Sequence, residues 1–119
     1  MSRSLIKPAL LAGMCTLMLS LSSQAASFDC AKAKAADEIA ICANLSLNDL
    51  DVTMALLYDL NKHFMAMGGR GALMDGQAAW LKQRRTCGSR AGCLSDAYTQ
   101  RIGMLRGFID ERVMTKGPF

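Results

Sequence analysis

The sequence holds few of the side chains and motifs on which catalysis usually depends. Its single histidine, His63, lies on a segment expected to be helical, faces away from the predicted buried side and is interpreted as a surface residue. There is no Cys-x-x-Cys redox motif, no Gly-x-Ser-x-Gly nucleophile motif and no His-Glu-x-x-His zinc motif. Asp49, Asp51 and Asp59 are interpreted as a solvated helix face without a neighbouring base. We therefore expect a protein that is not an enzyme and has no cofactor or metal, with a small hydrolase built on paired carboxylates as the alternative.

A strong charge of either sign is also missing. The 119 residues carry a formal net charge of +4, and removal of residues 1–25, with two basic and no acidic side chains, leaves +2. A nearly neutral domain gives no reason to expect nucleic acid or an acidic membrane surface as its partner.

The long apolar run of the sequence is confined to its N-terminus. Arg3 and Lys7 introduce apolar residues from Ala9 to Leu21, and Ser23-Gln24-Ala25 then offers small residues at the positions that signal peptidase recognises. The run is too short to span a bilayer comfortably. We therefore expect a cleaved signal peptide over 1–25, with an uncleaved anchor as the alternative.

The leader does not indicate a lipid anchor. Leu11-Ala12-Gly13-Met14-Cys15 resembles a lipobox, but Met14 occupies the position before the cysteine that needs a small residue. The mature chain, residues 26–119, is expected to form a single domain in the periplasm or outside the cell, without stable insertion in a membrane.

Removal of the leader leaves an even number of cysteines. Cys30, Cys42, Cys87 and Cys93 remain, which in a small exported domain indicates two disulfides. We favour the pairs Cys30–Cys42 and Cys87–Cys93, because each closes a short local loop. Cys30 then has to lie outside the helix that carries Cys42, since a continuous helix would hold the two about 18 Å apart. Zinc is the alternative, but the spacings lack the Cys-x-x-Cys knuckles of such sites.

The first half of the mature chain shows helical spacing and no strand pattern. A short helix is expected to begin near Asp37 and Glu38 and to end near Cys42. Ser46 is predicted to be the N-cap of the main helix. Apolar residues of the main helix recur at steps of three and four, if Asn61 fills one position of the series: Leu47, Leu50, Met54, Leu57 and Phe64.

Two more helices are expected after a glycine-rich break. Met67–Gly71 contains three glycines and is predicted to end the main helix. A helix from Leu73 to Thr86 follows, and its last turns hold basic residues, Arg84 among them, that complement the helix dipole. After the turn between Cys87 and Cys93, the last helix has one apolar stripe: Leu94, Tyr98, Ile102, Leu105, Ile109 and Val113. The predicted fold is all-α, a small up-down-up bundle with a short extra N-terminal helix and two disulfides.

Four residues stand out in the last two helices. Trp80 and Arg84 are four apart, so the guanidinium can lie across the indole, and Tyr98 and Arg101 are three apart on the next helix. These residues either pack the two helices together around the Cys87–Cys93 turn or form a surface that binds a partner.

The same residues belong to a series of short motifs that covers nearly the whole mature chain. The motifs are Phe28-Asp29-Cys30, Ile41-Cys42, Trp80-Leu81-x-x-Arg84-x-x-Cys87 and Cys93-Leu94-x-x-x-Tyr98-x-x-Arg101-Ile102-x-x-Leu105. In this combination they resemble the LprI-like lysozyme-inhibitor family of small exported bacterial proteins. The resemblance implies an exported helical domain that inhibits lysozyme.

The expected function is therefore that of a periplasmic binding protein whose partner is lysozyme or another peptidoglycan-cleaving enzyme. Because many lysozymes are strongly basic, an acidic patch of Asp49, Asp51 and Asp59 could meet such an enzyme. The candidate binding residues are Trp80, Arg84, Tyr98, Arg101, Asp49 and Asp51. The alternatives are an envelope structural or stress accessory protein without an enzyme target, and an immunity protein against an amidase effector of a type VI secretion system.

Overall fold

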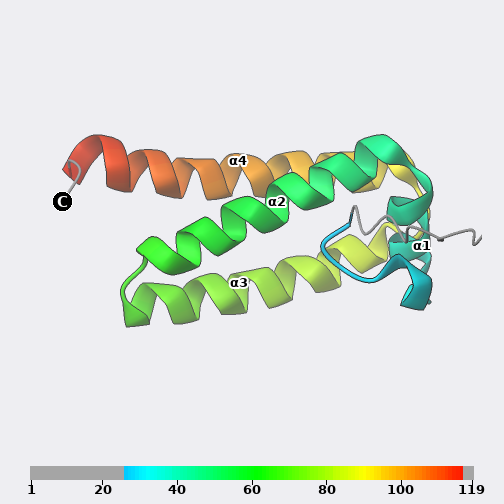
Figure 1. The fold of residues 1–119 in the computed structure, drawn as a ribbon, viewed down its shortest axis with the longest axis horizontal. Helices are drawn as coiled ribbons and strands as arrows, with labels where there is room; N and C mark the ends of the chain where they lie inside the picture. The colour runs from blue at the N-terminus through cyan, green and yellow to red at the C-terminus, as the bar shows by residue number, and fades with distance from the viewer. Residues whose placement is uncertain (1–25, 117–119) are drawn as a thin grey trace, which may run out of the picture.

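The computed structural model describes residues 26–116, with side chains through residue 112, and every regular element within them is helical. A 3-10 turn, η1 (Cys30–Lys32), and a short helix, α1 (Ala36–Ala43), precede the long helices α2 (Leu45–Phe64), α3 (Met67–Thr86) and α4 (Ala91–Lys116). In Figure 1 the long helices run in alternating directions, and α1 lies at the end where α3 meets α4. The predicted all-α, up-down-up bundle with an extra N-terminal helix is confirmed.

Both predicted disulfides are present. Cys30 begins η1, outside the helix that carries Cys42, and the chain folds back so that their Cα atoms lie 5.8 Å apart. Cys87 and Cys93 join the end of α3 to the first turn of α4, with their Cα atoms 5.5 Å apart. The cross-links therefore fix two local junctions, one before α2 and one after α3 in the sequence.

The N-terminus of α2 differs from the prediction. The N-cap is Asn44, whose side chain accepts a hydrogen bond from the backbone N–H of Leu47 at 3.2 Å, whereas Ser46 lies inside the first turn. Asn44 has an extended backbone because α1 ends at Ala43 and α2 leaves at an angle of 107° to it. The sharp bend between the two helices thus places the cap two residues earlier than the capping pattern indicated.

The predicted glycine-rich break between Met67 and Gly71 is wrong. These residues form the first turns of α3, and the chain reverses at Met65 and Ala66, which are extended. The side chain of Met65 is buried in the core. Burial of this side chain contributes about 1.5–3 kcal/mol, which is of the same order as the combined cost of the three glycines, about 1 kcal/mol each, in the first turns of α3.

The core lies between the predicted stripes of α2 and α4, with α3 packed against both. Its buried apolar residues on the long helices include Leu47, Met54, Leu73, Trp80, Leu94, Tyr98, Ile102 and Leu105. Asn61 takes its predicted place in the α2 series, where its side-chain amide donates to the carbonyls of Leu57 and Leu105 at 2.8 and 3.0 Å. Phe64, the last member of that series, is half exposed instead.

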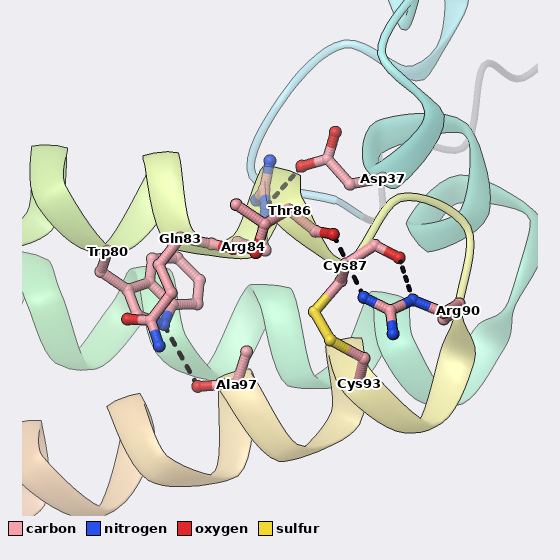
Figure 2. Close-up of a disulfide and its surroundings, with 9 residues drawn as sticks. All are labelled: Asp37, Trp80, Gln83, Arg84, Thr86, Cys87, Arg90, Cys93 and Ala97. Carbon is pink, nitrogen blue, oxygen red and sulfur yellow. Dashed lines mark hydrogen bonds and ion pairs between the residues drawn. A yellow bond between two sulfur atoms is a disulfide. The ribbon is translucent and has the colours of Figure 1, made fainter.

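The turn between α3 and α4 is held by more than its disulfide. Gly88 adopts a φ of 57°, a left-handed conformation that suits glycine at the end of a helix. Figure 2 shows the guanidinium of Arg90 turned back onto the end of α3, where it donates to the carbonyls of Cys87 and Thr86 at 3.0 and 3.2 Å. A cation beside the last carbonyls of a helix stabilises the helix terminus.

The disulfides and the helices also give information about the cellular compartment in which the protein folds. Two disulfides are typical of proteins that fold in an oxidising, extracellular environment. In residues 26–116, no helix is by itself long and apolar enough to cross a membrane; only α1 and α2 taken together reach that length and apolarity, across their sharp bend. The predicted signal peptide and the side chain of Val113 lie outside the described residues.

Replacement of both Cys87 and Cys93 by serine is expected to lower the free energy of unfolding by about 2 kcal/mol, because the unfolded chain regains the freedom of a short closed loop. In a domain of this size the melting temperature then falls by about 10 °C. Thermal unfolding followed by circular dichroism measures the change, with Ser89→Ala in the same turn as the control. An unchanged melting temperature in the double variant would show that the junction does not depend on its cross-link.

Candidate functional site

The structure buries five of the six candidate binding residues. Asp49 lies on the surface, and the buried ones are Asp51, Trp80, Arg84, Tyr98 and Arg101. The first of the two interpretations of Trp80, Arg84, Tyr98 and Arg101, that they pack the helices together, therefore describes their contacts. Asp51 is fully buried, so the prediction that it belongs to a solvated acidic face is wrong.

A network of charged and polar groups centred on Arg84 occupies the interior beside the two disulfides. Arg84 Nε donates to Asp37 Oδ2 at 2.9 Å, and its Nη1 donates to the hydroxyl of Tyr98 at 3.1 Å. The Tyr98 hydroxyl donates in turn to Asp51 Oδ1 at 2.7 Å, and Asp51 Oδ2 accepts from the backbone N–H of Ser27 at 2.6 Å. One guanidinium thus connects α1, α2, α4 and the segment before η1.

Aromatic rings pack against this network. The guanidinium of Arg84 lies 5.7 Å from the ring centres of both Phe28 and Trp80, which confirms the predicted contact between Arg84 and the indole. Trp80 meets Tyr98 edge-on at 5.2 Å and donates through Nε1 to the carbonyl of Ala97 at 3.2 Å, as Figure 2 shows for the second contact. The rings therefore add both packing and directional contacts between α3 and α4.

The electrostatics of the network explain why its charges are tolerated in the core. Burial, and then the carboxylate of Asp51, raise the pKa of Tyr98 far above its ordinary value. The Tyr98 hydroxyl therefore stays protonated and donates a hydrogen bond to Asp51. Burial alone would lower the pKa of Arg84, but Tyr98 and Asp37 outweigh this effect, so the pKa is raised and the guanidinium stays charged. The basic end of α3 was predicted to complement the helix dipole, yet Arg84 points inward and pairs with Asp37 (Figure 2).

The surface of α2 carries the feature that the sequence analysis missed. Opposite the buried stripe, five large apolar side chains are at least 38% exposed, and they follow one another along about 28 Å of helix: Leu45, Val52, Leu56, Leu60 and Phe64. We call these five residues the apolar face of α2. The signal was available in the sequence, because positions 52, 56, 60 and 64 recur every four residues and make α2 apolar on two sides.

Acidic residues border the apolar face of α2. Asp49 and Asp59 are exposed on the same side of the helix, and Asp59 pairs with Lys62 at 2.8 Å. The neighbouring helix is oppositely charged: α2 holds three aspartates and one lysine, whereas α3 holds one aspartate and four basic residues. Exposed apolar side chains flanked by polar groups are typical of protein-binding surfaces.

Among the described residues, the side chains of interest for catalysis or metal binding are those of His63, the carboxylates and the cysteines. His63 is exposed, as predicted, and its Nδ1 lies 2.7 Å from the carbonyl of Asp59 on its own helix. No group of three His, Cys, Asp or Glu side chains is placed to hold a metal ion within the part of the chain that the structure describes. All four cysteines of the described residues form disulfides.

Comparison of the chain with protein-family models, with curated proteins and with solved structures finds no match.

Arg84→Met is expected to lower the free energy of unfolding by about 3–5 kcal/mol, because it leaves Asp37 and Asp51 buried without their cation. Arg85→Met, which removes the same charge from an exposed neighbour, should change it by less than about 0.5 kcal/mol. Urea unfolding of the oxidised protein measures both. Equal effects of the two substitutions would contradict the central role given to Arg84.

Proposed function

We propose that this protein is an exported, periplasmic or secreted binding protein that inhibits lysozyme or another peptidoglycan-cleaving enzyme, and that it does so through the apolar face of α2. The observation that carries the proposal is the exposed apolar face itself, where Leu45 is 82%, Leu56 60% and Phe64 52% exposed. Apolar area of this length on one helix is costly to leave in water and suits a partner with a complementary cleft.

The charge bordering the face favours a basic partner. Asp49 and Asp59 place negative charge beside the apolar stripe, although the domain as a whole is slightly positive. Many lysozymes are strongly basic, and opposite charges at the rim of an interface increase the rate of association and fix the orientation of the partners.

The construction of the domain suits inhibition rather than catalysis. The disulfides and the Arg84 network connect α1, α2, α3 and α4, so α2 is held in place before a partner arrives. A binding surface that is already ordered loses less conformational entropy on association.

Two further observations support this proposal. The disulfides agree with folding after export, as the predicted signal peptide over 1–25 would require. The motifs around Trp80, Cys87 and Tyr98 resemble those of the LprI-like lysozyme-inhibitor family, and in this chain they build the interior that supports α2.

The oxidised protein is expected to inhibit the degradation of cell walls by a c-type or a g-type lysozyme in proportion to its concentration. Leu56→Gln, at the centre of the apolar face, should weaken this inhibition by about tenfold or more, because central apolar contacts dominate binding energies. Met74→Gln changes an equally large, half-exposed side chain on α3 and should leave inhibition unchanged.

The outcomes test the inhibition of lysozyme and the contribution of the apolar face of α2 separately. Failure to inhibit either enzyme at low and moderate salt rejects the proposed activity, and equal inhibition by the two glutamine variants rejects the apolar face of α2 as the contact.

The acidic border should matter through the association rate. Combined Asp49→Asn and Asp59→Asn substitutions are expected to slow association with a basic enzyme at low salt, with the difference disappearing at high salt as charges are screened. Asp96→Asn combined with Asp110→Asn removes the same charge from exposed positions of α4 and is the control. Surface plasmon resonance at two salt concentrations measures the rates, and equal effects of the two double variants would exclude a role for the border.

A further inference from the structure

A groove is lined by residues of α3 and α4 toward the start of α3 and the last turns of α4, away from the turn that joins these two helices. Figure 1 shows these two helix ends on the same side of the bundle. It encloses about 370 Å³, within the range of pockets that hold small molecules. Its wall on α3 is formed by the small residues Gly69, Ala72 and Gly76, which leave the space open. Larger apolar side chains line much of the rest: Met65, Leu73, Met104 and Phe108. Three charged residues complete the lining: Arg101, Glu111 and Arg112.

Arg101 brings a buried guanidinium to this groove. Only 5% of its surface is exposed, and its Nη1 and Nη2 lie 3.8 and 4.0 Å from the point where a Cβ on Gly76 would be. Nε donates to Gln77 Oε1 at 3.0 Å, and Nη1 contacts the sulfur of Met104, a weak acceptor, at 3.6 Å. Nη2 is buried and has no hydrogen-bond partner.

The comparison with Arg84 shows what Arg101 lacks. Arg84 is equally buried, but it donates to the carboxylate of Asp37 and lies 3.7 Å from that of Asp51. Arg101 has an amide oxygen and a thioether where Arg84 has two carboxylates, and burial lowers the pKa of Arg101, an effect that Tyr58 only partly offsets. A buried donor without a partner is unfavourable, and an anion at Nη2 would satisfy it.

We propose that the groove between α3 and α4 is a binding site for an aliphatic carboxylic acid, with its carboxylate accepting hydrogen bonds from Arg101 and its hydrocarbon chain packed against Met65, Met104 and Phe108. The buried guanidinium of Arg101 beside the apolar part of the lining suits a negative charge attached to hydrocarbon, because the charge is paired while the chain leaves water. The site is separate from the apolar face of α2, so it adds to the proposed function and does not depend on it.

The methionine methyl groups report directly on this site. In the oxidised protein with ¹³C-labelled methionine methyls, decanoate below its micelle-forming concentration is expected to shift the signals of Met65 and Met104, which line the groove, and not that of Met74. Decanol, with the same chain but no charge, should bind about tenfold more weakly or worse, as should acetate, which has the charge without the chain. No shift at Met65 and Met104, or equal affinities for decanoate and decanol, would overturn the proposal.

Two substitutions with matched controls test whether decanoate binds in the groove and whether the charge of Arg101 holds it. Ala72→Leu fills the groove from an exposed position on α3 and should weaken decanoate binding by about tenfold or more, whereas Ala78→Leu on the same helix should not. Arg101→Met should do the same by removing the charge, and Arg106→Met removes a charge from the surface of α4 as its control. If Arg101→Met unfolds the domain, Ala72→Leu still decides, since decanoate binding that survives a filled groove places the ligand elsewhere and refutes the site.

Discussion

The arrangement of this domain depends on how the guanidinium of Arg84 is accommodated in its interior. Within a small core, the cation draws a partner from each neighbouring element: Asp37 from α1, Tyr98 from α4 and, through Tyr98, Asp51 from α2. A shift of any one of these helices would leave a buried charge without its partner, which costs far more than the loss of one apolar contact. The network therefore restricts the relative positions of the helices more narrowly than apolar packing alone would.

Local constraints in the sequence were enough to predict most of the fold. The loops closed by Cys30–Cys42 and Cys87–Cys93 are short, the stripe of α4 repeats regularly, and Trp80 and Arg84 are one turn apart on the same helix, so each prediction needed only nearby residues. Features set by distant partners could not be predicted in this way. Asp37 and Arg84 are 47 residues apart, as are Asp51 and Tyr98, and a buried aspartate looks like a surface aspartate in a helical pattern. The helix boundaries at Asn44 and Met65 were likewise decided by a bend and by burial in the core.

The two faces of α2 follow from different requirements. On the inner face Asp51 tolerates complete burial because the Tyr98 hydroxyl and the Ser27 N–H donate to its carboxylate. The side-chain nitrogen of Asn61, which is also fully buried, donates to the carbonyls of Leu57 and Leu105. On the outer face Val52, Leu56 and Leu60 contribute nothing comparable to the interior, and polar residues there would keep the helix equally stable and more soluble. The inner face accounts for folding, and the protein partner that we propose would account for the outer face.

The stabilising interactions are distributed unevenly along the bundle, which matters for the apolar face of α2 and for the groove between α3 and α4. In Figure 1, α1 lies beside the α3–α4 turn. The disulfides, the Arg84 network and the Trp80–Tyr98 contact all join residues of α1 or of the halves of the long helices toward this end. At the opposite end α3 begins with three glycines in its first turns, and the groove separates it from α4. Elements held by few contacts open most readily, so a ligand bound there would add stability where the domain has least, without moving the α2 residues anchored at the other end.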